Sequence, residues 1–458
     1  MVGGRWTAEA SLTTDHPPPT TRALPWHRLA ALNSLAFALG LVNNTLEPAV
    51  LGHRTLELAP QLKNTAFGLL TFAGLVVAIA WQPVIGDLSD RTRTRWGRRL
   101  PFFVGGGAVL IACLFLIALA PGIGFFLPLL LLIQLSSNTI QSPSQALFPD
   151  HIPQDQRGAA AGWKSALEIL GFVAGRQISG RLVAEGAVMA AVAVAAAAVV
   201  VAITIVALVA REQGAPQTPP RLPRFSLRRA FAFERRANPS FGPWFANRAL
   251  VWGGFLALNT FLLFFVIDVL GLPEAQAQRF VADLSALMGI GVILVALPAG
   301  LLADRIGRRR LLAASGMTAA GGTALLLAWP STTMALVAGG ILGVSAGVFL
   351  TASWALATQI VPTTQAARML GLANIATAAG SGLARLTGGL IIDPINRAAG
   401  NAAAGYFLLF ALAGLAFLGG SAATLRLPPD HLPARGGPFE GPSHNVIPSA
   451  PQGREESL

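Results

Sequence analysis

Two long apolar runs are separated by the charged stretch Gly86-Asp87-Leu88-Ser89-Asp90-Arg91-Thr92-Arg93-Thr94-Arg95-Trp96-Gly97-Arg98-Arg99-Leu100-Pro101. A shorter version of the same pattern lies roughly half a chain later, as Gly300-Leu301-Leu302-Ala303-Asp304-Arg305-Ile306-Gly307-Arg308-Arg309-Arg310. A charged loop that recurs between apolar runs is typical of a membrane protein built from two related halves. The sequence therefore predicts a duplicated membrane protein.

The whole chain is too apolar for a soluble domain. Hydrophobic residues make up 53% and charged residues only 12% of its 458 residues. A helix needs about 20 mostly apolar residues to cross a hydrocarbon core about 30 Å thick. The runs contain Gly and Pro and lack the alternation of barrel strands, which favours an all-α protein. About twelve spans are predicted, near residues 28–50, 65–87, 101–120, 123–148, 158–183, 187–210, 244–268, 280–303, 311–329, 332–355, 368–392 and 403–425.

The net charge of +12 follows the predicted topology. Arginines gather in the loops 87–100, 211–243 and 303–310, whereas the loops between them carry few basic residues. By the positive-inside rule, we expect the arginine-rich loops and both termini to be cytoplasmic in a multi-pass protein of the cell inner (plasma) membrane. This distribution argues against a nucleic-acid partner and leaves membrane lipids as a secondary one.

Several classes of site are excluded by composition. Cys113 is the only cysteine, so an intramolecular disulfide and a cysteine metal site are impossible. We expect no metal and no cofactor, and the motifs of hydrolases, zinc proteases and phosphate-binding loops are missing, which argues against an enzyme. The polar first 24 residues predict no removable signal peptide, and we expect 1–27 and 427–458 to be disordered and cytoplasmic.

A second repeat relates the two halves at a constant offset of 209 residues. Seven positions of the first half reappear in the second with Gly, Pro, Arg and Gln in register. They are Ile152, Pro153, Gln156, Gly162, Gly171, Arg176 and Gly180, matched by Val361, Pro362, Gln365, Gly371, Gly380, Arg385 and Gly389. We therefore expect six-helix bundles over 28–210 and 244–426, joined by a cytoplasmic loop over 211–243.

The repeated loop, Gly-x-x-x-Asp-Arg followed by Gly-Arg-Arg, resembles the signature of the major facilitator superfamily. The resemblance implies a major facilitator fold with two pseudo-symmetric halves and alternating access. It also implies that the motif latches the cytoplasmic side of the outward-facing state through breakable Asp–Arg bonds. The alternative is that these loops only fix topology. The implied gate residues are Gly86, Asp90, Arg91, Gly97, Arg98, Arg99, Arg157, Gly300, Asp304, Arg305, Arg308 and Arg309.

The segments 82–102 and 138–157 resemble the sucrose-transporter-like branch of the glycoside-pentoside-hexuronide:cation symporters. Ala78 and Gln82 stand where melibiose-type relatives carry the acids that bind sodium, so coupling to sodium through that site is not expected. Gln134 and Gln145 stand where plant sucrose carriers offer an acid and an arginine. The solute is therefore left open.

Ionisable residues inside spans are costly and usually functional. Glu168 lies about 15 Å along its predicted helix and Lys164 one turn before it, so the two share a face. Glu47, next to Asn44 and Pro48, is a second candidate for proton coupling. The alternatives are a structural ion bridge or a snorkelling lysine for the first pair, and a solvated external carboxylate for Glu47.

Polar side chains inside other predicted spans are candidates for binding a solute. Gln134, Asn138 and Gln141 share one helix face, where amides either recognise hydroxyls or join helices. The remaining candidates are Asn44, Asn259, Trp354 and Asn374. The repeat-related Arg176 and Arg385 are expected to cap, gate or snorkel near the outer ends of their helices, and Asp268 and Asp283 are expected to be solvated.

These residues favour a proton-coupled symporter that imports a sugar, a glycoside or a similar solute and works as a monomer. Two alternatives stay open. One is a proton-antiporting exporter of drug-like compounds, although the helix motif Gly171–Gly180 lacks the proline usual in that group. The other is a non-transporting membrane scaffold or assembly factor on the same fold.

Overall fold

The computed structural model describes residues 24–153, 156–210, 240–360 and 366–427. Within these ranges the chain is helical, and its pairing between extended residues is limited to one isolated bridge, from Thr94 to Gly97. The first group of helices comprises α1 (Trp26–Leu32), α2 (Ser34–Asn44), a π-helical segment (Thr45–Leu51), α3 (Gly52–Leu58), α4 (Lys63–Arg91), α5 (Leu100–Leu119), α6 (Phe126–His151), α7 (Arg157–Ala184) and α8 (Val188–Val209). The second comprises α10 (Phe241–Asp268), α11 (Glu274–Ile306), α12 (Arg308–Ala328), α13 (Thr332–Ile360), α14 (Ala366–Ala399) and α15 (Ala404–Thr424).

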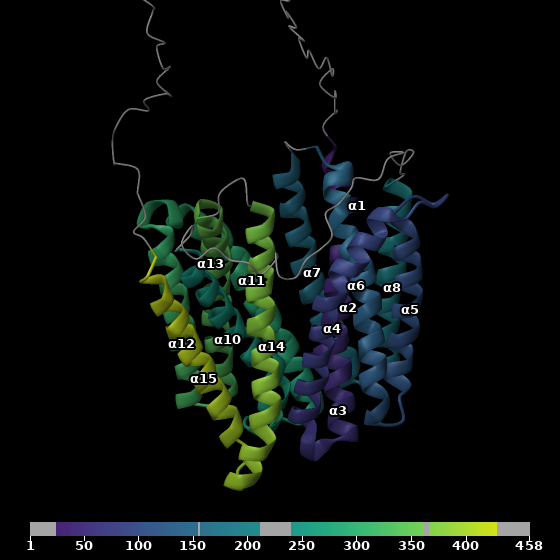
Figure 1. Ribbon diagram of the computed structural model, residues 1–458. Helices are drawn as coiled ribbons and strands as arrows, with labels where there is room; N and C mark the ends of the chain where they lie inside the picture. The colour runs from purple at the N-terminus through teal and green to yellow at the C-terminus, as the bar shows by residue number, and fades with distance from the viewer. Residues whose placement is uncertain (1–23, 154–155, 211–239, 361–365, 428–458) are drawn as a thin grey trace, which may run out of the picture.

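Eleven helical segments of the described chain are long and apolar enough to cross a membrane. The predicted fifth span, α7, is not among the eleven, because Lys164, Glu168, Arg176 and Arg181 dilute its hydropathy. It is nevertheless 28 residues long and lies alongside the other helices (Figure 1). The prediction of an all-α membrane fold is confirmed.

The helices form two groups that lie side by side (Figure 1). Helices α1–α8 make one group and α10–α15 the other, and the groups meet where α4 packs on α14 and where α7 packs on α11. Because successive helices run in opposite directions, the loops 92–99 and 307 lie at one end of the molecule, here called the arginine-rich end. The loops 59–62, 269–273 and 400–403 lie at the other, here called the arginine-poor end.

Glycines of the repeat mark close helix contacts within each group. A β-carbon at Gly171 would lie 2.2 Å from the carbonyl oxygen of Phe37, and one at Gly380 would lie 2.2 Å from that of Ala249. Gly171 therefore lets α7 touch the backbone of α2, and Gly380 lets α14 touch the backbone of α10. Small residues permit this approach between membrane helices.

The last glycine of each repeat lies between the two groups. A β-carbon at Gly180 would lie 3.1 Å from that of Ala282 in α11, and one at Gly389 would lie 3.1 Å from the Cα of Gly68 in α4. Ala282 and Gly68 are themselves equivalent, since 282 − 68 = 214 is the offset of the charged motif, 300 − 86 = 214. The repeated sequence thus builds two equivalent contacts between the groups.

The first span differs from its predicted range of 28–50. It begins at Ser34, after the short separate helix α1, and continues to Leu58 through the π-helical turn Thr45–Leu51. Pro48 lacks an N–H for the regular ladder, and a π-turn absorbs such a defect without ending the helix. Glu47 therefore lies eleven residues, or about 16 Å, from the arginine-poor end of the span and not near its outer boundary.

Candidate functional site

Arg385 of α14 reaches across to the other group of helices. Its Nη2 donates to Oε2 of Glu47 at 2.7 Å, and its Nη1 donates to the carbonyl oxygen of Thr71 in α4 at 3.4 Å. Arg385 is buried and Glu47 is half-buried. Arg385 lies about 21 Å from the end of α14, so the ion pair is near the middle of a hydrocarbon core about 30 Å thick.

Arg176 of α7 makes the equivalent contacts with different chemistry. Its Nε donates to Oγ of Ser285 in α11 at 3.1 Å, and its Nη2 lies 3.5 Å from Oδ1 of Asn259 in α10. Ser285 matches Thr71 at the same offset, since 285 − 71 = 214. Nη1 of Arg176 is buried and has no hydrogen-bond partner among the described residues. Both arginines were expected to snorkel or cap near the outer ends; instead, both are buried between the groups.

The two arginines therefore differ in the group that the first span of the opposite half presents. Arg385 meets the carboxylate of Glu47, whereas Arg176 meets the amide of Asn259. Among the contacts described for these two buried guanidinium groups, Glu47 is the one carboxylate, and it bonds Arg385. We call Glu47, Arg176 and Arg385 the ionic cluster.

A second polar network joins the groups at the arginine-poor end. Nζ of Lys63 lies 2.5 Å from Oδ1 of Asp268, and the hydroxyl of Tyr406 donates to Oδ2 of Asp268 at 2.7 Å. Nδ2 of Asn64 donates to Oδ1 of Asp393 at 2.7 Å and to the Tyr406 oxygen at 2.9 Å. These five residues form what we call the closing network.

The closing network corrects one expectation and leaves another in place. Asp268 was expected to be solvated, but its side chain is only 15% exposed, because Lys63 and Tyr406 cover it from the opposite group and from α15. Asp283 is exposed as expected, and it receives a hydrogen bond from Arg181 of α7 at 3.2 Å. His53 of α3 and Glu274 of α11 add a further contact of 2.5 Å at the same end.

At the arginine-rich end, the described contacts of the charged motif stay within each group. Arg99 is buried and pairs with Asp90 at 2.6 Å, while Arg91 pairs with Asp87 at 2.8 Å. In the second copy, Arg308 donates to the carbonyl oxygen of Ala355 at 2.8 Å. The latch predicted for this end therefore remains a proposal for another state of the protein.

The other gate candidates fill structural positions in the same loops. Gly97 and Gly307 have φ of +93° and +97°, which favour glycine. Gly86 lies against Ser142 and Gly300 against Thr351, while Arg305 is exposed and Arg98 half-buried. Arg309 donates to the carbonyl oxygen of Leu425 at 2.7 Å. The side chains of Arg157 and Asp304 lie outside the described residues.

The predicted amide stripe of α6 faces α4. Nε2 of Gln82 donates to Oδ1 of Asn138 at 2.9 Å and to Oε1 of Gln141 at 3.4 Å, and Gln134 packs against Gly74. These contacts favour the alternative in which the amides join helices. Gln82, at the position where the resemblance would place a sodium-binding acid, here joins α4 to α6 through hydrogen bonds.

The remaining candidates are exposed or bond only within their own helix. Lys164 and Glu168 pair at 3.3 Å on one face of α7, where Lys164 is half-buried and the side chain of Glu168 is 53% exposed. Asn44 donates to the carbonyl oxygen of Gly40 in its own helix at 2.9 Å. Trp354 and Asn374 are exposed. The predicted site residues therefore do not form a single cluster.

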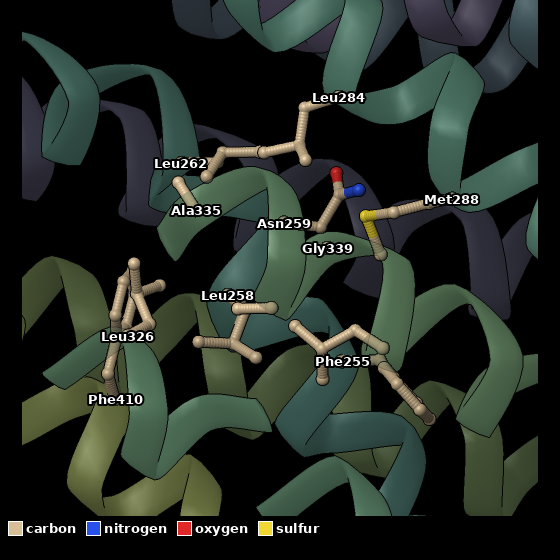
Figure 2. A pocket seen from close by; sticks show the side chains of 12 residues that line it. Phe255, Leu258, Asn259, Leu262, Leu284, Met288, Leu326, Ala335, Gly339 and Phe410 are labelled. Atoms are coloured by element: carbon tan, nitrogen blue, oxygen red, sulfur yellow. The ribbon is translucent and has the colours of Figure 1, made fainter. Parts of the chain in front are cut away.

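A small apolar cavity of about 30 Å³ lies between α10, α11, α12, α13 and α15. Figure 2 shows the Asn259 amide among apolar side chains such as Leu258, Leu284 and Met288. The volume suits water-sized groups and is too small for a sugar ring. The cavity therefore serves as apolar backing for Asn259 rather than as a solute site.

Two helix groups that meet through equivalent pairs, with a shared ionic cluster at mid-depth, define a membrane transporter of the major facilitator class. The family model described as MFS/sugar transport protein matches residues 37–421. The chain belongs to this family of sugar transporters.

Curated relatives match over shorter stretches. The sucrose transport protein SUC3 of Arabidopsis thaliana is 28% identical over 128 residues, which cover 22% of each chain. The general alpha-glucoside permease of Schizosaccharomyces pombe is 26% identical over 134 residues, 25% of this chain and 24% of that one. The matched stretches thus span about a quarter or less of these relatives.

Solved structures match over most of the chain. The nucleoside transporter NupG has a TM-score of 0.64 and 14% identity, over 87% of this chain and 98% of that one. A bacterial homolog of the human lysosomal transporter Spinster, in an inward-facing and unoccupied conformation, has a TM-score of 0.62 and 19% identity, over 89% of this chain and 95% of that one. At these identities the likeness establishes the fold alone.

Proposed function

We propose that the protein is a secondary active transporter that couples proton movement to the uptake of a sugar or glycoside by alternating access. The observation that carries this proposal is the ion pair between Glu47 and Arg385. It joins the two halves near mid-depth, where a charged group without a partner is costly. A change in the charge of Glu47 therefore changes the contact between the halves.

Proton coupling follows from this contact. A proton that binds Glu47 cancels its negative charge and weakens its bond to Arg385, so that α14 is less firmly held to the first span. If solute binding changes the affinity of Glu47 for the proton, the two gradients are linked reciprocally. Glu47 is 24% exposed, which leaves its carboxylate a route to water.

Glu168 is the weaker of the two coupling candidates. Its partner, Lys164, lies on the same helix, so neutralising Glu168 breaks no contact between the halves. Its exposure also makes its ion pair worth little in free energy. We assign the coupling proton to Glu47 and keep Glu168 as the internal control.

The closing network supports an assignment of state. Its residues hold the halves together at the arginine-poor end, while the bonds described for the charged motif at the other end lie within each half. With the arginine-rich end assigned to the cytoplasm of an inner-membrane protein by the positive-inside rule, the molecule is in an inward-facing state. The bodies that would rock are 28–210 and 244–426, and the motif would latch them in the outward-facing state.

The test is uptake into proteoliposomes under an imposed inward proton gradient, with labelled sucrose, maltose and methyl glucoside. Wild-type protein and Glu168→Gln should accumulate at least one of these sugars. Glu47→Gln should lose accumulation but keep exchange of the same sugar across the membrane, since exchange does not need the coupling proton. Movement of a cationic dye in place of every sugar would instead support a proton-antiporting exporter.

A further inference from the structure

Arg248 of α10 is a buried cation that the ionic cluster of Glu47, Arg176 and Arg385 does not include. Its side chain is held by two other helices. Nε donates to Oγ1 of Thr377 in α14 at 3.0 Å, and Nη1 donates to Oγ of Ser353 in α13 at 3.1 Å. The residue is only 5% exposed, so its guanidinium plane is fixed in place.

Two tryptophans flank this guanidinium. The Cζ atom of Arg248 lies 5.0 Å from the ring centroid of Trp354 and 5.9 Å from that of Trp244, within the range of cation–π attraction. Trp244 is fully buried, and its Nε1 donates to the carbonyl oxygen of Ser353 at 3.1 Å. Trp354, in contrast, is 40% exposed. The stack thus ends in an indole ring that is open on one side.

The contacts that the structure describes for Arg248 are to neutral groups. Hydroxyls and indole rings surround it, and the hydrogen bonds described for it are made by Nε and Nη1. Trp354 lies six residues, or about 9 Å, before the end of α13 at Ile360, which is at the arginine-rich end. In the inward-facing state proposed above this is the open end, so solute that enters there can reach an indole that faces between the halves.

A further polar side chain lies on the helix that carries Thr377. Asn374 is exposed and lies three residues before Thr377 on α14, which puts both on the same helix face. Its amide offers both donors and an acceptor. An open indole face and an exposed amide together match a sugar ring, whose C–H face stacks on aromatics and whose hydroxyls take hydrogen bonds.

We propose that Trp354, with Asn374 beside it, is the platform on which the sugar ring of a glycoside stacks, and that Arg248 is the positioning residue that holds the indole in place. This inference rests on the proposed function for its solute class. It adds a specificity rule: the site selects solutes by an unsubstituted ring face and belongs to the C-terminal half. At the repeat-equivalent position, 354 − 209 = 145, the N-terminal half has Gln145 and therefore no matching aromatic platform.

The experiment measures binding of p-nitrophenyl α-glucoside to the full chain in nanodiscs by calorimetry. We expect Trp354→Ala to weaken binding about tenfold and Arg248→Gln about fivefold, with Trp354→Phe close to wild type because it keeps an aromatic face. Trp329→Ala is the matched control, since Trp329 is also an exposed tryptophan but lies at the arginine-poor end of α12. Near-ultraviolet circular dichroism of Arg248→Gln should change in the tryptophan bands, whereas Arg305→Gln should leave them unchanged.

The outcomes separate the two proposals. No binding to wild-type protein, or equal binding to wild type and Trp354→Ala, overturns the platform. Binding that depends on Trp354 in a protein that accumulates no sugar with protons supports the platform and overturns proton-coupled uptake. Binding that survives Glu47→Gln but not Trp354→Ala supports the division of roles between the two sites.

Discussion

Arg385 and Arg176 stand at equivalent positions in the two halves, yet one holds a carboxylate and the other an amide. Each lies on a helix that packs against the opposite half. Arg385 bonds Thr71 there, and Arg176 bonds the equivalent residue, Ser285. The difference lies in the second partner, which is Glu47 for Arg385 and Asn259 for Arg176. We call the contact of Arg385 with Thr71 and Glu47 the charged crossing, and the contact of Arg176 with Ser285 and Asn259 the neutral crossing. A proton on Glu47 would weaken the charged crossing, whereas the neutral crossing has no carboxylate to protonate.

This asymmetry gives the two crossings different tasks. In low dielectric, an ion pair is strong only while both partners keep their charges. In the proposed mechanism, protonation of Glu47 therefore weakens the Arg385 crossing but leaves the bonds of Arg176 to Ser285 and Asn259 in place.

The largest expected effect comes from removing one partner of the charged crossing. Arg385→Gln leaves Glu47 without its partner, and breaking a buried pair costs about 3–5 kcal/mol. We expect a lower melting temperature in detergent and loss of uptake. The double variant with Glu47→Gln should recover much of the stability, because neither charge is then unpaired. Equal melting temperatures for Arg385→Gln and wild type would show that the pair does not stabilise this state.

A second effect tests the close packing at the charged crossing. A β-carbon at Gly68 would lie 2.6 Å from the Arg385 carbonyl oxygen and from the Cα of Gly389. Gly68→Ala should therefore push α4 from α14 and disfavour closure at the arginine-poor end. Spin labels at Leu88→Cys and Ile306→Cys, in a Cys113→Ser background, report on the arginine-rich end. They should come closer on average as that end closes.

The control for this substitution is Gly105→Ala, because a β-carbon at Gly105 meets no other atom within 4 Å. It should leave the label distance and transport at wild-type values. If both alanine variants behave alike, the crowding at Gly68 does not govern the balance between the two states.

A third effect makes the neutral crossing resemble the charged one. Asn259→Asp gives Arg176 a carboxylate, so the two crossings become equivalent in charge. We expect the arginine-poor end to stay closed for longer, with turnover about tenfold slower and the same spin labels farther apart at the arginine-rich end. Faster turnover in this variant would mean that the neutral partner is not what keeps the crossing easy to open.

The sequence predicts the frame of this comparison but not its chemistry. The charged motif and the offset of 209 residues are enough to relate Arg176 to Arg385, because duplicated helices keep glycine and arginine in register. Their partners depend on the rotation of other helices, which periodicity leaves undefined. Glu47 was placed too near the membrane surface, because the sequence pattern around Pro48 does not tell a π-turn from a helix end.

Pairs between the halves were the hardest to predict. Asp268 reads as a loop carboxylate, and its burial needs Lys63 and Tyr406 to come together from distant parts of the chain. Contacts within one half can be hidden in the same way: Arg248 is an arginine inside the predicted span 244–268, but its partners Trp354 and Thr377 come from two other helices. Long-range contacts of this kind leave no local pattern.

The smallest expected effect lies in the closing network, where a single substitution leaves most of the hydrogen bonds in place. Asp268→Asn removes the charge that Lys63 pairs with but keeps an acceptor for Tyr406, so closure should weaken by about 1 kcal/mol, or roughly fivefold in the balance of states. Raising the salt concentration should lower this difference, since it screens the pair in wild type but not in the variant. If instead the label distances of wild type and Asp268→Asn agree at low salt, the ion pair between the halves at this end is incidental, and closure rests on the crossings of Arg176 and Arg385 alone.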